Sequence, residues 1–309
     1  MNSQMFSRRE NKINTNNNNN NNSNNEYKSK IYDEIAILMR SFGDISDSSL
    51  QIRESIILVE KILIQQLQEI LENAMNNAHK RTGSFVPNQL DFELLMVKNK
   101  PKLARFRKYM RNIQKIQRKN EQKHAGSNYD MNFLNQIAEE NKSDDEEIND
   151  TENMRRLYRA DRISQILSVE KYEEFQKARC WSSNIKNKIS FLNKLMEILQ
   201  VPKEIQDDSN CLEIIQFLTH ETVATLIDYS ILTRLNSKTL SAMDQNIVQS
   251  NLSNNMLRFC PEVTQGRAFD GIKPVKVQEI QEAMRRFHLM RNQKKIGFPH
   301  ETKAAFLAL

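Results

Sequence analysis

Few side chains in this 309-residue sequence have the types and spacing that catalysis or metal binding requires. The three cysteines, Cys180, Cys211 and Cys260, stand far apart, without a Cys-x-x-Cys pair or a cysteine–histidine spacing typical of zinc ligands. They are expected to be buried free thiols. Glycine-rich phosphate loops and the common hydrolase and metalloprotease motifs are missing from the sequence. We therefore expect no enzyme activity, no metal and no cofactor.

The pair His220-Glu221 comes nearest to a catalytic arrangement, but it falls inside a predicted long helix. A single histidine in such a helix is more often packed or solvated than catalytic. Glu221 and the nearby Asp228 leave two interpretations open. They are either ordinary polar residues on the solvent-facing side of the helix or an acidic contact for a basic partner. Surface ion pairs of this kind are individually weak.

A strongly basic stretch lies in the first half of the chain. Residues 98–124 hold eleven Lys or Arg against one acidic residue, Glu121, and their apolar side chains keep helical spacing. The candidate basic surface consists of Lys102, Arg105, Arg107, Lys108 and Arg111. Phosphate binding is one interpretation. A helix that docks on the first fold with its charged heads in water is the other, and the lack of an aromatic platform or base-reading motif favours it.

The elements that must position these residues form a helical pattern that occurs twice. Each copy has a short amphipathic helix, a long apolar-striped helix and another short helix. The predicted ranges are 31–42, 50–79 and 87–97, then 188–199, 210–235 and 276–291. Pro87 is expected at the first position of its helix. A long helix that is apolar around much of its circumference needs more than one partner to cover it.

A central helix flanked by two short ones, which then needs a second such unit, is the logic of the histone fold. We predict an all-α chain in which two histone folds form an intramolecular pseudo-heterodimer. Apolar side chains spaced three or four residues apart define the face that each long helix buries. The predicted pairing core is Ile56, Val59, Leu63, Leu67, Ile70, Leu218, Thr222 and Leu226.

Composition divides the chain into five parts. Residues 1–29 are an Asn-rich tail that is expected to be disordered, because it cannot bury enough apolar surface. The remaining parts are a first histone fold with a basic C-terminal helix (30–124), an acidic linker (125–153), a connecting helical segment (154–187) and a second histone fold (188–309) with a long loop (236–272). No apolar stretch is long enough to span a membrane, and the beginning of the chain lacks a signal-peptide core.

Two sets of motifs resemble families of transcription proteins. The first unit resembles the eighteen-kilodalton subunit family of the general transcription factor TFIID, in the Phe42-Gly43-Asp44 ending of its first helix and in residues 90–96. The second half is similar to the Spt-three family, in residues 217–228 and 272–286 and in Ala304-Ala305-Phe306-Leu307-Ala308. Members of that family carry two histone folds in one chain, belong to the SAGA coactivator and act on the TATA-binding protein.

The resemblance implies a non-catalytic coactivator subunit in the nucleus, working with other SAGA-type subunits in transcription initiation by RNA polymerase II. Such a subunit would contact the TATA-binding protein and regulate its delivery to promoters, which makes Glu221 and Asp228 candidate contacts. Contact with DNA would be indirect or weak. Two alternatives stay open: a histone-like DNA-binding protein, and a TFIID histone-fold subunit that pairs in trans.

Overall fold

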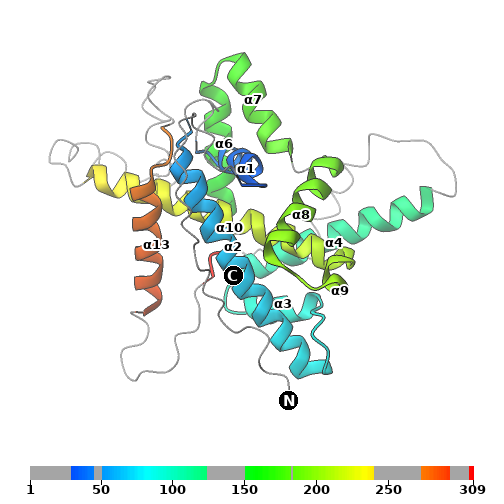
Figure 1. The fold of residues 1–309 in the computed structure, drawn as a ribbon. Coiled ribbons are helices and arrows are strands. Elements are labelled where there is room, and N and C mark those ends of the chain that lie inside the picture. Colours follow the sequence, from blue (N-terminus) through cyan, green and yellow to red (C-terminus); the bar gives the residue numbers. More distant parts are fainter. Residues whose placement is uncertain (1–28, 45–50, 124–149, 182–183, 240–272, 293–305) are drawn as a thin grey trace, which may run out of the picture.

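The computed structural model describes residues 29–44, 51–123, 150–181, 184–239, 273–292 and 306–309 (Figure 1). These ranges form ten α-helices and contain no β-strand. The all-helical fold class predicted from the sequence is therefore confirmed for the described part of the chain. The predictions for the Asn-rich tail, for most of the acidic linker and for nearly all of the long loop lie outside these residues.

Four helices make up the first half, and capping residues explain where they start and stop. They are α1 (Tyr32–Ser41), α2 (Arg53–Thr82), α3 (Gln89–Met96) and α4 (Lys100–Lys123). Gly83 ends α2 with φ +76°, a left-handed conformation that glycine adopts without strain. Asn88 caps α3 through a reciprocal pair of hydrogen bonds with Asp91. The cap is Asn88, so Pro87 precedes the helix and the prediction that it opens the helix is wrong.

Six helices follow in the second half of the chain. They are α6 (Thr151–Ile166), α7 (Val169–Cys180), α8 (Ile185–Leu199), α9 (Lys203–Gln206), α10 (Ser209–Thr239) and α13 (Val277–Asn292). Helix α6 begins within the stretch that the sequence assigns to a linker, because the Asp150 side chain accepts a hydrogen bond from Asn153 N–H at 3.1 Å and caps it. Helix α10 continues four residues beyond its predicted end at residue 235.

The helices of the two halves interlock around the long helices α2 and α10. These two helices cross near the centre of the molecule, with α13 beside them (Figure 1). Helix α2 packs against α8, α10 and α13 of the second half, and α10 packs against α1, α3 and α4 of the first half. Thirty residues of helix extend about 45 Å, at about 1.5 Å per residue. Several shorter helices are needed to cover that length, and they come from both halves.

One continuous apolar core results from this arrangement. It includes buried side chains of α1 to α4, of α8 to α10 and of α13, together with Leu307 and Ala308. A smaller cluster, Ala160, Ile163 and Phe175, joins α6 to α7. None of the helices in the described ranges is long and apolar enough to cross a membrane.

Candidate functional site

Three consecutive residues at the end of α1 reach three different elements of the second half. The first, Phe42, packs edge-on against His220 of α10, with ring centroids 6.2 Å apart and an interplanar angle of 87°. Burial lowers the pKa of His220 to about 4. The imidazole is therefore neutral at physiological pH, as a packed residue rather than a proton-transfer group.

Gly43 lies where helix α6 approaches the end of α1. Its φ of +100° is a conformation that side-chain-bearing residues rarely adopt. A Cβ atom at this position would lie 3.1 Å from Arg159 Nε and 3.3 Å from Ile163 Cδ1. The glycine thus satisfies two demands at once, a left-handed turn and the close approach of a second helix.

Asp44 forms a hydrogen bond with the irregular segment before α13. Its carboxylate accepts a hydrogen bond from the backbone N–H of Val275 at 2.6 Å and another from Gln51 at 2.9 Å. The carbonyl of Val275 accepts one from the Ser55 hydroxyl at 2.7 Å. Burial raises the pKa of Asp44, while the bonds from Gln51 and Val275 act in the opposite direction. Both backbone groups of Val275 are therefore held by side chains of the first half.

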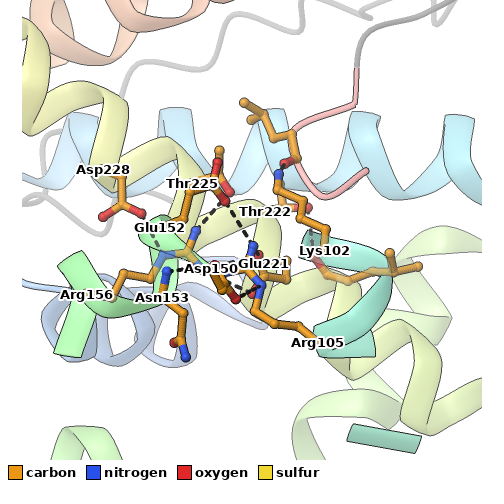
Figure 2. Close-up of polar contacts among 12 residues, drawn as sticks. Lys102, Arg105, Asp150, Glu152, Asn153, Arg156, Glu221, Thr222, Thr225 and Asp228 are labelled. Atoms are coloured by element: carbon orange, nitrogen blue, oxygen red, sulfur yellow. Dashed lines mark hydrogen bonds and ion pairs between the residues drawn. The ribbon is translucent and has the colours of Figure 1, made fainter. Parts of the chain in front are cut away.

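A cluster of charged side chains joins α4, α6 and α10, and we call it the polar junction (Figure 2). Arg156 is at its centre: its Nε bonds to Asp228 Oδ2 at 2.6 Å, its Nη1 to Glu221 Oε1 at 3.0 Å and its Nη2 to Thr225 Oγ1 at 3.1 Å. Arg159 also donates to Asp228. Burial lowers the pKa of Arg156, but the carboxylates of Asp228 and Glu221 outweigh it, so the guanidinium stays charged.

Helix α4 contributes the remaining positive charges of the junction. Arg105 donates to Glu152 at 2.9 Å, lies 3.2 Å from Asp150 and lies 3.4 Å from Glu221. Lys102 is 4% exposed, and burial lowers its pKa while the nearby Glu152 and Glu221 raise it. Four cationic groups face four carboxylates: Lys102, Arg105, Arg156 and Arg159 against Asp150, Glu152, Glu221 and Asp228. Balanced charge is what allows such groups to be buried together.

The sequence-predicted core residues all lie inside the molecule. The five from α2 and the three from α10 are each at most 2% exposed, and they belong to helices that contact one another. They are Ile56, Val59, Leu63, Leu67, Ile70, Leu218, Thr222 and Leu226. Thr222 satisfies its hydroxyl by donating to the carbonyl of Leu218 at 2.8 Å. Their role in pairing two histone folds stays a prediction.

The candidate basic surface divides into an inner and an outer set. Arg105 points into the polar junction and Lys102, at its edge, directs its ammonium to the Leu307 carbonyl, whereas Arg107, Lys108 and Arg111 are exposed on α4. Arg107 forms an ion pair with Glu93 of α3 at 2.7 Å. The apolar stripe of α4 packs on the core through Phe106 and Met110, as the docking interpretation expects.

The candidate acidic contacts, Glu221 and Asp228, both lie in the polar junction. Sequence reasoning placed them on α10 but missed the arginines of α6 that bind them. The charged composition of residues 154–166 was a signal for α6, but nothing in the sequence pairs Arg156 with carboxylates more than sixty residues away. The partner-contact interpretation stays a prediction.

The described residues contain no group of three or more His, Cys, Asp or Glu side chains arranged to hold a metal ion. Cys211 is buried, and its thiol donates to the carbonyl of Pro87 at 3.2 Å. Burial raises the pKa of this thiol, which keeps it protonated. Cys180 is exposed, so the expectation of burial is wrong for that residue, and Cys260 lies outside the described ranges.

Comparison with known proteins places this architecture in a family. The family described as transcription initiation factor IID, 18kD subunit, matches residues 29–125, the region of α1 to α4. SAGA complex subunit Spt3 of Drosophila melanogaster is 40% identical over 264 residues, which cover 84% of this chain and 68% of the relative. The chain belongs to the Spt3 family.

The length of the Spt3 match indicates whether the second half of the chain also resembles Spt3. A match of 264 residues is longer than either half, so the Spt3 likeness extends across both, whereas the TFIID-subunit match covers the first half alone. Residues 42–44 and the polar junction connect these two halves of the Spt3-family chain. No solved structure matches the chain.

Proposed function

We propose that this Spt3-family chain is a structural, non-catalytic subunit of a SAGA-type coactivator complex that regulates transcription initiation in the nucleus. The observation that carries the proposal is the 40% identity to a SAGA complex subunit over both halves of the chain. The pairing of the cationic groups of the polar junction with carboxylates supports a scaffold rather than a reaction site. The TFIID alternative needs only one histone-fold unit, and the likeness of the second half to Spt3 argues against it.

The exposed apolar side chains of α3 support a role in an assembly. Leu90, Leu94 and Val97 are about half exposed and are spaced three or four residues apart, so they share one side of this helix. Contiguous exposed apolar surface is typical of a protein that docks on others. A subunit surrounded by neighbours would cover these residues.

The test of complex membership is purification of the tagged full-length chain from nuclear extract, followed by mass spectrometry. We expect recovery of SAGA-type subunits in stoichiometric amounts. Recovery of TFIID subunits without SAGA subunits would contradict the proposal. Leu94→Asp together with Val97→Asp is a useful second bait, because it changes only exposed side chains and should keep the fold while reducing recovery of any neighbour that binds α3.

The intramolecular pairing of two histone folds forms part of the proposal. It is supported by the contact of α2 with α10 and by the shared core. A protease site inserted between residues 124 and 149 of the full chain allows cleavage after folding. We expect the two fragments to stay together through gel filtration at low protein concentration. Separation of the fragments would contradict intramolecular pairing.

We further propose that Glu221 and Asp228 provide an acidic contact for the TATA-binding protein. Both carboxylates are bonded to Arg156, so a basic partner has to compete with that guanidinium. Arg156→Gln should therefore strengthen binding of purified TATA-binding protein, and Glu221→Gln should weaken it. Glu204→Gln, at an exposed position of α9, is the matched control. Unchanged binding in both junction variants would place the contact elsewhere.

The histone-like DNA-binding alternative depends on the outer face of α4. Arg107, Lys108 and Arg111 are exposed there, which favours some attraction to phosphates. We expect duplex binding to be weak at physiological salt, since three of the five residues of the predicted basic surface already contact other groups of the chain. A salt titration of duplex affinity measures this, and tight binding at physiological salt would favour the alternative.

A further inference from the structure

The four-residue segment Phe306–Leu309 bonds to α2 through Gln66 and to α4 through Lys102, and we call the place that it fills between these side chains the groove. Leu307 and Ala308 are completely buried, while Phe306 and Leu309 are partly buried against the same core. The segment forms no helix or strand, and it lies beside the middle of α2, where Gln66 bonds to it (Figure 1). Side-chain burial and a few specific bonds therefore hold it, without regular secondary structure.

Two buried polar side chains form hydrogen bonds with the two polar backbone groups of Leu307. The backbone N–H of Leu307 donates to Gln66 Oε1 of α2 at 2.9 Å, and Lys102 of α4 donates its ammonium to the Leu307 carbonyl. Gln66 and Lys102 are 5% and 4% exposed. Burying an amide and an ammonium is costly unless each finds a partner. The groove can therefore bind a peptide backbone: Gln66 accepts from its N–H group and Lys102 donates to its carbonyl oxygen.

The side-chain environment adds selectivity to this backbone recognition. Leu307 and Ala308 have no exposed surface, so the groove fits a leucine followed by a small residue. A larger residue in place of Ala308 would need space that the packed core does not offer. A charged residue in place of Leu307 would be desolvated without a partner.

We propose that this groove, formed by α2 and α4 around Gln66 and Lys102, is a peptide-binding site whose resident ligand is residues 306–309. A separate extended peptide of the type Phe-Leu-Ala-Leu exchanges with the resident segment. The proposal is tested on the purified chain, so its failure and the failure of complex membership are distinguishable. Groove occupancy is also linked to the polar junction, because Lys102 faces Glu152 and Glu221 electrostatically while bonding to Leu307.

The experiment uses the full chain carrying Leu307→Asp, which empties the groove. The probe is a fluorescent peptide with the sequence of residues 301–309, and binding is measured by anisotropy. We expect saturable binding to the variant and at least tenfold weaker apparent binding to the wild-type chain, where the resident segment competes. Adding Lys102→Met to the variant should weaken peptide binding at least about tenfold, since it removes a charged hydrogen-bond donor.

Two controls define the failure of the proposal. A peptide with aspartate at the position of Leu307 should not bind, and a probe that binds all chains equally would show non-specific attachment and overturn the proposal. Should the Leu307→Asp chain not fold, as judged by circular dichroism, a wild-type chain with a protease site between residues 293 and 305 replaces it. After cleavage, an excess of labelled peptide should displace the released segment and incorporate at one equivalent. No incorporation would overturn the proposal.

Discussion

The contact between α2 and α10 and the polar junction join the same two halves of the chain by opposite physical means. The helix contact buries apolar side chains such as Leu63 and Leu218, and its stabilisation is non-directional and grows with the area removed from water. The polar junction depends on the positions of individual atoms around Arg156. Losing apolar contacts lowers the stability in proportion to the area exposed, whereas losing one charged group of the polar junction leaves the opposite charges there unbalanced.

The largest effect is expected in the apolar contact. Leu63→Ala removes a side chain with no exposed surface and leaves a cavity, so we expect a loss of about 2–5 kcal/mol in the free energy of unfolding, measured by urea denaturation. Leu94→Ala, at a position 53% exposed, should change it by less than about 0.5 kcal/mol. Equal losses in the two variants would show that α2 is not buried as described.

Arg156→Met tests the polar junction and should lower the free energy of unfolding by about 3 kcal/mol, because Glu221 and Asp228 would lose the cation that joins them and four carboxylates would face three cationic groups. Adding Glu221→Gln should recover part of the loss, because three carboxylates would then face the three remaining cationic groups. Arg285→Met breaks an exposed pair with Glu282 and should cost less than about 1 kcal/mol. A junction variant as mild as this control would mean that solvent screens the junction.

The two glycines with positive φ in the described ranges, Gly43 and Gly83, allow the cost of backbone strain to be separated from the cost of disturbing a helix contact. Gly43→Ala should cost about 1–3 kcal/mol, since the new Cβ is strained and also meets Arg159 and Ile163. Gly83→Ala has similar strain, with φ +76°, but no atom within 4 Å of the new Cβ, so it should cost about 1 kcal/mol. The difference between the two, measured as unfolding free energies, isolates the docking of α6 on α1. Identical costs would argue against that docking.

The last comparison concerns pH. Burial holds the pKa of His220 near 4 in the folded chain, below its ordinary value of 6.5, so the unfolded chain binds an extra proton between these values. The contribution of His220 to stability is therefore full above about pH 6.5 and is lost as the pH falls towards 4. His220→Gln should flatten this part of the unfolding profile, while His288→Gln, at an exposed position, should keep the wild-type slope. An unaltered slope in His220→Gln would contradict the burial of this ring.

The candidate site illustrates which features could be predicted. The triplet Phe42-Gly43-Asp44 was recognisable as a motif, but the three contacts that it makes depend on elements distant in sequence: His220, Arg159 with Ile163, and Val275. The start of helix α6 was predicted three residues late, because the helical segment was expected from residue 154 and residues 151–153 were assigned to the acidic linker. The single cap at Asp150 distinguishes a helix start from a continued linker.

Helix type, helix length and the buried face of α2 follow from the sequence alone, because a repeat of three or four residues acts between neighbours along one helix. The same is true of the Gly83 stop and of the overall doubled pattern. Tertiary structure decides the rest: Lys102 meets Leu307 across 205 residues, and Arg156 meets Asp228 across 72. Such bonds need two atoms within about 3 Å, and no local pattern carries that information. Packing of the helices brings the atoms together, and the charges are paired only after that packing exists.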